Sequence, residues 1–148
     1  MTLDTEVSSL RQVPLFRGVE PARLKLLAFT SERVHFEAEQ AFFARGDVAD
    51  AAYLILDGAA AVTIDGPLGP FRLALLGANA LVGEMGILAD QPRSATVTAE
   101  TPTTALRIDR TVFLELLAQF PQIAIAVMRE LALRLEQTNQ QLAAQRRD

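Results

Sequence analysis

The chain has 148 residues, half of them hydrophobic, with a formal net charge of -4, a pI near 5.0 and no cysteine. This length and apolar content suit one globular domain with its own core, covering residues 1–148. The acidic balance excludes a dedicated nucleic-acid surface, which would need clustered Lys and Arg side chains. The lack of cysteine excludes disulfides, thiolate zinc sites and thiol nucleophiles.

No segment has the features of a membrane span or a secretory signal. The apolar run from Ile123 to Met128 is far too short to cross a bilayer. Residues 1–15 lack the basic start and the continuous apolar core of a signal peptide. We therefore expect a cytoplasmic protein with no membrane partner.

Residues 1–32 form a helical N-terminal region in our interpretation. Apolar residues recur there at roughly helical spacing, and Pro14 and Pro21 interrupt the pattern. Pro21 suits the first turn of a helix, where its missing N–H is not needed. The predicted helices cover about residues 4–12 and 20–29.

Residues 33–109 change to short apolar or alternating runs that are separated by turn residues. Dipeptides such as Asp57-Gly58 tolerate positive φ where the chain reverses, which favours tight hairpins. This spacing indicates antiparallel strands in a barrel or a sandwich. We expect an antiparallel β-barrel of the jelly-roll type, so that the fold is mainly β with flanking helices. The predicted strands are 33–38, 41–45, 52–56, 59–64, 71–76, 94–99 and 103–108.

Residues 110–145 return to helical spacing. Asp109 is a suitable N-cap for a helix that continues to Phe120, and Pro121 then starts a longer helix that runs to about Gln145. The region therefore predicts two C-terminal helices, of which the second is the longest element of the chain.

The second of these helices carries an apolar stripe with alternating spacings of three and four residues. So narrow a stripe favours pairing with a second copy, which predicts a homodimer. Alternatively, the part before Leu133 packs on the chain's own barrel, because core-facing helices share this spacing. Beyond Leu135 the helix is too polar to be buried. The stripe consists of Met128, Leu131, Leu135, Thr138 and Leu142.

Residues 83–96 contain a glycine-rich segment with the strongest chemical signal. Gly83 and Gly86 allow main-chain N–H groups to approach a ligand closely. A short helix over Glu84–Leu88 would present unpaired N–H groups and a positive dipole end. An oxyanion is the natural guest of such a segment.

Three side chains in this segment indicate which kind of oxyanion would bind. Arg93 has a permanent charge and a forked geometry that matches phosphate oxygens, and Ser94 can donate one more hydrogen bond. Glu84 would repel a phosphate, so it either faces a sugar hydroxyl pair or is held by Arg93 in an empty site. A nucleotide sugar-phosphate satisfies both requirements. The alternative is a surface salt bridge between Glu84 and Arg93 that binds nothing.

The run Gly-Glu-Met-Gly-Ile-Leu-Ala-Asp-Gln-Pro-Arg-Ser-Ala-Thr-Val, from Gly83 to Val97, resembles the phosphate-binding cassette of the cyclic-nucleotide-binding domain family. This family includes bacterial catabolite activator proteins, protein kinase regulatory subunits and gated channels. Val13–Phe16 resembles the helix that leads into the family's β domain, and Tyr53–Gly58 resembles its central hairpin. The resemblance therefore extends over nearly the whole chain.

The resemblance implies a ligand and a set of binding residues. The ligand would be cyclic AMP, with cyclic GMP as the second choice, and no other cofactor is implied. Glu84 would accept the ribose 2′-hydroxyl, and Arg93 would pair with the cyclic phosphate. The remaining residues of the expected site are Val82, Gly83, Met85, Gly86 and Ser94.

The long helix resembles the family's last helix, which in bacterial members dimerises and closes over the base. Thr138 and Asn139 fall where bacterial activators place polar side chains against the adenine, although an ordinary polar interruption of the stripe explains them too. Before the cassette, Asn79–Val82 stands for the usual Gly-Asp/Glu-aliphatic-Phe. Asn79 can adopt positive φ, whereas the smaller Val82 changes the local packing and the shape of the pocket.

We expect a non-enzymatic sensor domain that couples nucleotide occupancy to its last helix. The alternative is a structural module of the same fold that pairs without a ligand. His35 is the only histidine, and Glu84 and Arg93 lack a nucleophile or metal ligands, so we expect no catalytic or metal site. Bacterial activators continue into a helix-turn-helix domain, so we expect a stand-alone bacterial-like member that does not bind DNA by itself.

Overall fold

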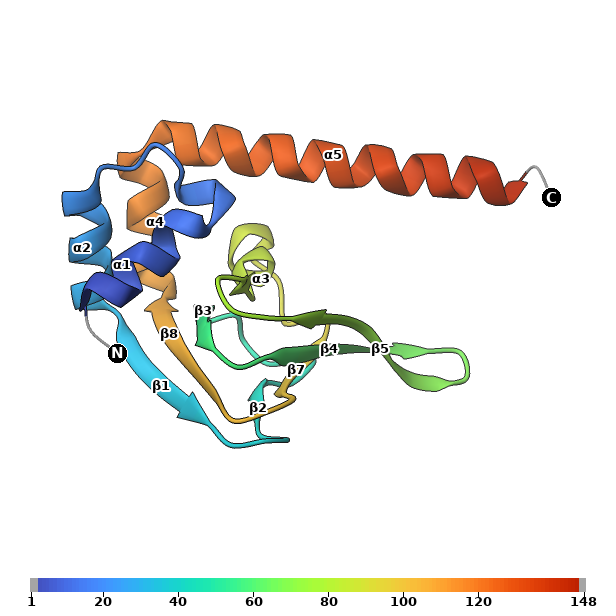
Figure 1. Cartoon of the computed structure of the whole chain (residues 1–148). Helices are drawn as coiled ribbons and strands as arrows, with labels where there is room; N and C mark the ends of the chain where they lie inside the picture. Colours follow the sequence, from blue (N-terminus) through green and yellow to red (C-terminus); the bar gives the residue numbers. More distant parts are fainter. Residues whose placement is uncertain (1–2, 147–148) are drawn as a thin grey trace.

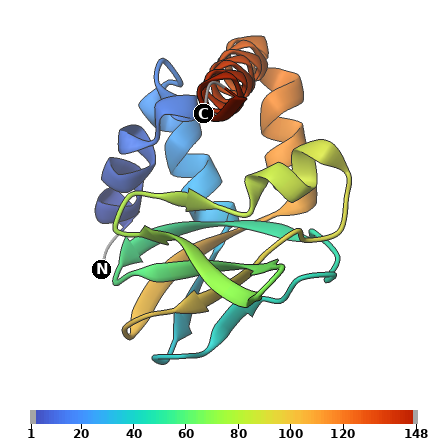
Figure 2. The same ribbon diagram turned by 90° about the vertical axis from the view of Figure 1, so that its right-hand side faces the viewer.

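The computed structural model describes residues 3–146, which form β sheets with a layer of helices on one side (Figure 1 and Figure 2). The elements in chain order are α1 (Leu3–Gln12), the 3-10 turn η1 (Pro14–Phe16), α2 (Pro21–Thr30), β1 (Glu32–Phe36), β2 (Ala41–Phe43), β3 (Ala51–Asp57), β4 (Ala60–Gly66), β5 (Gly69–Leu76), β6 (Leu81–Val82), α3 (Glu84–Ala89), β7 (Thr96–Ala99), β8 (Thr103–Asp109), α4 (Arg110–Gln119) and α5 (Pro121–Arg146).

The strands pair in two four-stranded sheets, in the orders β1-β8-β3-β6 and β2-β7-β4-β5. Every pairing is antiparallel, as expected for strands joined by short turns. The prediction of an antiparallel β domain with flanking helices is therefore confirmed. The predicted barrel closure is not observed, because no pairing between residues 3 and 146 joins the edge strands of the two sheets. Two of these edges are very short strands, β2 and β6.

Strand β3 lies between two hydrophobic clusters, one on each face of its sheet. Ala52 and Leu54 point into a cluster shared with the helices. Tyr53 and Ile55 point the other way, into a cluster between the sheets. Because neighbouring side chains of a strand face opposite sides, a strand covered on both faces is apolar throughout. This explains why Ala51–Ile55 is continuously buried.

The helical layer is built around buried side chains from α1, η1, α2, α4 and the start of α5. Pro21 occupies the first turn of α2, and the Asp109 carboxylate accepts the main-chain N–H of Thr111 at the start of α4. The largest fully buried side chains of this layer are Leu10, Phe16, Leu24, Phe113 and Ile123. The helices therefore cover the face of the β1-β8-β3-β6 sheet that would otherwise be exposed.

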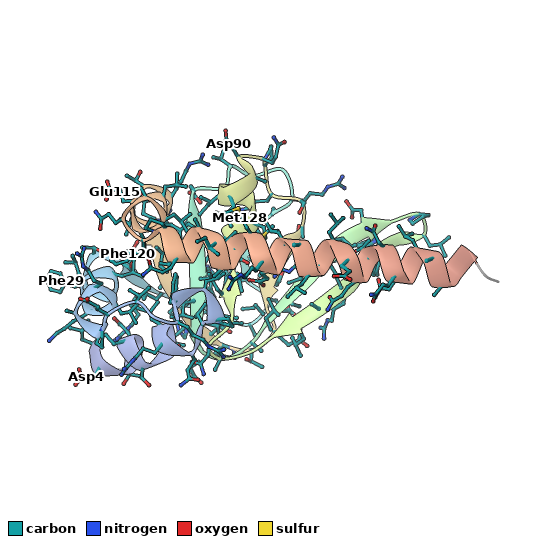
Figure 3. All side chains as sticks on the ribbon, turned by 90° about the horizontal axis from the view of Figure 1, so that it is seen from above. Asp4, Phe29, Asp90, Glu115, Phe120 and Met128 are labelled. Atoms are coloured by element: carbon teal, nitrogen blue, oxygen red, sulfur yellow. The ribbon has the colours of Figure 1, made fainter. Side chains whose placement is uncertain are left out.

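Helix α5 and the β4–β5 hairpin extend in the same direction from this body, with α3 between the sheets and the helix (Figure 1). Seen from above, α5 crosses over the hairpin (Figure 3). Within the described residues, no single helix is long and apolar enough to span a membrane. Helices α4 and α5 have the required length and apolar character only when they are taken together, and this pair is bent by 104°.

Candidate functional site

The glycine-rich segment forms a short helix entered through a left-handed residue. Gly83 has φ 87° and ψ 3° and directly precedes α3. Asp90, which follows the last residue of α3, is also in the left-handed region. After α3, the main chain at Arg93 is hydrogen-bonded to the loop that follows β2. The Arg93 N–H donates to the Asp47 carbonyl, and the Gly46 N–H donates to the Arg93 carbonyl, each at 2.8 Å. These bonds fix the main chain on both sides of the Arg93 side chain.

The Arg93 side chain is buried, with 4% of the residue exposed. Its Nη1 donates to the Gly83 carbonyl at 2.5 Å, and its Nη2 donates to the Ala51 carbonyl. The guanidinium carbon lies 3.9 Å from the centre of the Phe43 ring, a cation–π distance. A Cβ atom at Gly83 would lie 2.7 Å from Nη1, so only glycine leaves room for this guanidinium.

The charge of Arg93 is incompletely compensated. Its Nε is buried and has no hydrogen-bond partner. The carboxylate paired with it belongs to Asp50, at 3.9 Å from Nη2. Burial lowers the pKa of the Arg93 guanidinium, and Asp50 opposes this effect. A buried cation with an unpaired donor is the arrangement that an anion would stabilise.

Glu84 begins α3 and is also buried, with 9% of the residue exposed. Burial raises the pKa of its carboxyl above the usual 4.5, and an interaction with its own main-chain N–H opposes the rise. Arg93 pairs with Asp50 and main-chain carbonyls rather than with Glu84. The interpretation as a surface salt bridge between Glu84 and Arg93 is therefore wrong, because both side chains are buried and they do not pair.

Glu84 and Arg93 share a pocket of about 370 Å³, a size in the range of small-molecule sites. Its polar wall comes from the segment that follows β6, and its apolar wall comes from β2, β4, β5 and β7. The lining residues are Phe43, Val62, Ile64, Leu73, Leu76, Leu81, Val82, Gly83, Glu84, Met85, Gly86, Arg93, Ser94, Ala95, Val97 and Arg134. The pocket therefore joins a charged end to an apolar end.

Seven of the residues expected at the site from the sequence lie together in this pocket: Val82, Gly83, Glu84, Met85, Gly86, Arg93 and Ser94. Ser94 is exposed and Val82 is buried against the aromatic cluster between the sheets. Asn79 has φ 71°, which confirms the expected left-handed turn before the segment. The Ser9 hydroxyl also donates to the Asn79 side-chain oxygen at 2.7 Å, so α1 holds this turn.

Thr138 and Asn139 do not reach the pocket in this structure. Both are exposed on α5, and the Thr138 hydroxyl donates to the Arg134 carbonyl of its own helix at 2.9 Å. Neither residue lines the pocket. Their assignment to the base stays a prediction, which requires α5 of this chain or of a second copy to move over the pocket.

The lining residues that sequence reasoning did not assign to the site include Phe43 on β2 and Arg134 on α5, which come from distant elements. Arg134 forms an ion pair with Glu130 one helical turn earlier, with Nη2 and Oε1 2.6 Å apart. The only sequence signal for Arg134 is its i, i+4 spacing from Glu130, which is also common on exposed helix surfaces. Phe43 has no sequence feature that separates it from an ordinary core residue.

The apolar stripe on α5 is exposed rather than packed against the chain's own sheets. Met128, Leu131, Leu135 and Leu142 have exposed fractions of 61%, 37%, 62% and 53%. Packing against the body ends near Val127, which is 7% exposed. Figure 3 shows Met128 on α5 near the body of the protein. The alternative that the chain's own sheets bury this part of the stripe is therefore wrong for Met128.

Between residues 3 and 146 no group of three or more His, Cys, Asp or Glu side chains is arranged to hold a metal ion. His35 is exposed on β1, where its Nδ1 lies 3.3 Å from the Thr104 hydroxyl. This histidine does not line the pocket.

Known proteins resemble this chain in sequence and in fold. The family model of the cyclic nucleotide-binding domain matches residues 33–120. The CRP-like cAMP-activated global transcriptional regulator of Mycobacterium tuberculosis is 31% identical over 135 residues, 90% of this chain and 60% of the relative. The cyclic AMP receptor protein of Thermus thermophilus is 33% identical over 131 residues, 87% of this chain and 60% of the relative.

The fold is also found in a solved structure. The crystal structure of the Thermus thermophilus catabolite activator protein matches with a TM-score of 0.79 and 31% identity, covering 88% of this chain and 62% of that chain. This chain thus spans about three fifths of the length of these relatives. The matched family region includes the whole glycine-rich segment and ends directly before α5.

Proposed function

Because this chain belongs to the cyclic nucleotide-binding domain family, we propose that it binds a cyclic nucleotide in the pocket at residues 83–96 and works as a regulatory domain. The observation that carries the proposal is the Arg93 side chain. It is a buried guanidinium with an unpaired Nε at the charged end of a pocket. A cyclic phosphate supplies the negative charge and the acceptor oxygens that this group lacks.

Each polar residue then has a defined role. Arg93 exchanges at least one main-chain carbonyl for phosphate oxygens, and the exposed Ser94 hydroxyl adds a donor at the opening of the pocket. Glu84 accepts the ribose 2′-hydroxyl, which gives its buried carboxylate a hydrogen-bond donor. The apolar wall, including Leu73 and Leu76, receives the flat face of the base.

We favour cyclic AMP over cyclic GMP as the ligand. The two bacterial relatives are named as a cAMP-activated regulator and a cyclic AMP receptor protein, which supports this choice. Thr138 and Asn139 remain our candidates for contacts with the base, once α5 of one copy closes over the pocket.

Coupling between the pocket and α5 completes the proposal. The same helix carries Arg134, which lines the pocket, and the exposed stripe that we assign to homodimer formation. A ligand that touches Arg134 therefore acts on the element that forms the dimer. A difference of about 1–3 kcal/mol between the affinities of two α5 arrangements is enough for useful coupling.

Titration calorimetry of the purified chain tests this function. We expect a saturable heat with cyclic AMP, weaker binding of cyclic GMP, and no comparable binding of linear 5′-AMP, whose extra phosphate charge and open ring do not match the pocket. The proposal is wrong if neither cyclic nucleotide gives a saturable heat.

A second function is a module that pairs through α5 without a ligand. One observation favours it, because the Gly83 and Ala51 carbonyls already occupy both terminal nitrogens of Arg93. Analytical ultracentrifugation with and without cyclic AMP separates the two functions. A dimer whose sedimentation is unchanged by cyclic AMP, together with no detectable nucleotide binding, supports the ligand-independent pairing module.

A further inference from the structure

Helix α5 brings a second pair of charges to the pocket. Arg134 lines it together with Glu84, and Glu130 holds the Arg134 guanidinium at 2.6 Å. The Glu130 and Arg134 side chains are 42% and 51% exposed, so this pair lies at the surface where α5 passes over the pocket. In Figure 1, α3, which begins with Glu84, lies below α5.

Two acids therefore share one base in this region. Glu84 is buried at the charged end of the pocket and Glu130 lies on α5, with Arg134 in electrostatic reach of both. Burial raises the pKa of the Glu84 carboxyl most, Arg134 lowers it and Glu130 raises it. The charges of both α5 residues thus extend to the pocket.

We propose that Glu130 is a positioning residue that weakens nucleotide binding, because it holds Arg134 on the surface of α5 and adds negative charge beside the pocket. This inference rests on the proposed function. A cyclic nucleotide carries a negative phosphate, so the Glu130 carboxylate repels it and at the same time competes for the guanidinium that would attract it. Both effects weaken binding, so removal of the Glu130 carboxylate should raise the affinity for the nucleotide.

The pair can be exchanged when a ligand enters. An exposed ion pair with i, i+4 spacing stabilises a helix only weakly, so an anion in the pocket can draw Arg134 away from Glu130. The Arg134 guanidinium then loses its ion pair with Glu130 and gains an interaction with the anion in the pocket. Occupancy of the pocket is thereby transmitted to the charge pattern of α5.

The matched test uses Glu130→Gln and Glu136→Gln. Both substitutions remove one negative charge from α5, but Glu136 is exposed and lies about 200° around the helix from Arg134. We expect Glu130→Gln to lower the dissociation constant for cyclic AMP about 3- to 10-fold and Glu136→Gln to change it less than about 2-fold, because a distant exposed charge is screened. An affinity of Glu130→Gln equal to or below that of wild type overturns the inference.

A double-substitution cycle tests whether Glu130 acts through Arg134. Arg134→Gln should weaken binding, and Glu130→Gln should improve affinity less than about 2-fold in the Arg134→Gln protein, since the two residues are in contact. An undiminished effect of Glu130→Gln in that background shows that Glu130 does not work through Arg134, and it overturns the positioning role.

Titration of the Glu84 carboxyl by ¹³C NMR in the ligand-free protein separates this inference from the proposed function. The charged groups acting on Glu84 are Arg134, Glu130 and Arg93. We expect Glu130→Gln to lower the pKa of Glu84, Arg134→Gln to raise it and Glu136→Gln to leave it unchanged. If wild type binds no nucleotide, the proposed function is wrong and the inference falls with it. If wild type binds cyclic AMP but the Glu84 pKa is unchanged in Glu130→Gln, the inference alone is overturned.

Discussion

Arg93 combines a structural role with the phosphate-binding role that we propose for it. It satisfies the Gly83 and Ala51 carbonyls, stacks on Phe43 and keeps its Nε unpaired. A buried guanidinium of this kind stabilises the empty pocket through its carbonyl bonds, while its uncompensated charge favours an anionic ligand. In the proposed function, a phosphate oxygen replaces at least one of these carbonyls.

Arg93→Lys tests the fork geometry while keeping the charge. A lysine has a single ammonium and cannot reproduce two parallel bonds to a phosphate, so we expect a loss of affinity for cyclic AMP of about 10- to 100-fold. Titration calorimetry measures it, with Arg72→Lys as the control, since Arg72 is exposed and pairs with Glu100. Equal affinity of Arg93→Lys and wild type would contradict the phosphate role.

Gly83→Ala tests the space beside Arg93. Gly83 and Gly18 both have φ 87°, so alanine strains the main chain at either position by about 1 kcal/mol. At Gly83 the new Cβ would also lie 2.7 Å from Arg93 Nη1, whereas at Gly18 nothing lies within 4 Å. We expect urea unfolding to show a loss of stability in both variants, larger in Gly83→Ala, and a loss of nucleotide affinity only in Gly83→Ala. If Gly18→Ala also loses affinity, the weaker binding of Gly83→Ala results from lower stability and not from the lost space beside Arg93.

Glu84→Gln tests the raised pKa of the buried carboxyl. A folded-state pKa above the unfolded value means that the stability contribution of Glu84 is present below pH 4.5 and is lost as the pH rises through the folded pKa. Glutamine stays neutral, so the free energy of unfolding of Glu84→Gln minus that of wild type should be larger at pH 7 than at pH 4. Urea unfolding at both pH values measures it, and the exposed Glu136→Gln should show no such difference.

The same Glu84 variant should bind cyclic AMP more weakly. A hydrogen bond from a ribose hydroxyl to a charged acceptor contributes about 1.5–3 kcal/mol, so we expect a loss of about 10- to 100-fold. A variant that gains stability at pH 7 and loses affinity would show that the buried acid is retained for binding. If Glu84→Gln binds as tightly as wild type, Glu84 does not contact the ribose.

At the scale of elements, α5 has two sides with different partners. Its first turns bury Ile123 and Val127 against the body, and further along Arg134 faces the pocket. The stripe with Leu131 and Leu135 lies on another side and is exposed. A second copy of the helix is the partner that we propose for this stripe.

Leu135→Glu and Leu133→Glu form a matched pair for the dimer. The two leucines are 62% and 60% exposed on the same helix, but they point about 200° apart and only Leu135 belongs to the stripe. We expect Leu135→Glu to shift the chain to monomer in sedimentation velocity and Leu133→Glu to leave the dimer intact. If both variants or neither remain dimeric, the stripe is not the contact surface.

The elements themselves were largely predictable from the sequence. Turn residues bounded most strands, and Pro21, Asp109 and Pro121 marked the helix starts that the structure confirms. Strand β6 was missed because two residues are too short for any periodic pattern. Pairings between distant strands, such as β1 with β8 and β2 with β7, could not be read from local patterns.

The site was predictable only where its residues are close in sequence. Gly83, Glu84 and Arg93 lie within one short segment, so a local motif contains all three. Phe43 and Arg134 join them through the fold, from β2 and α5, and no motif in the sequence connects either residue with the segment. The bonding of Arg93 to main-chain carbonyls was likewise hidden, because a carbonyl leaves no trace in residue identity.

At the scale of the whole molecule, the helices and the pocket lie on opposite sides of the β1-β8-β3-β6 sheet but meet at α5. The helical cluster covers one face of this sheet, and the aromatic cluster lies between the sheets. Helix α5 extends from the helical layer past α3 (Figure 1), and its Arg134 lines the pocket. In the proposed function, the ligand lies between the two sheets and one long helix. Movement of α5 is therefore the change through which we expect occupancy to be reported.

A crystal structure of the chain with cyclic AMP tests the central claim most directly. We predict the cyclic phosphate on Arg93 beside Gly83 and Gly86, the ribose 2′-hydroxyl on Glu84, and at least one of the two Arg93 bonds to main-chain carbonyls replaced by a bond to phosphate. A nucleotide bound elsewhere, or an Arg93 side chain that keeps both carbonyl bonds and does not touch the phosphate, would contradict the account.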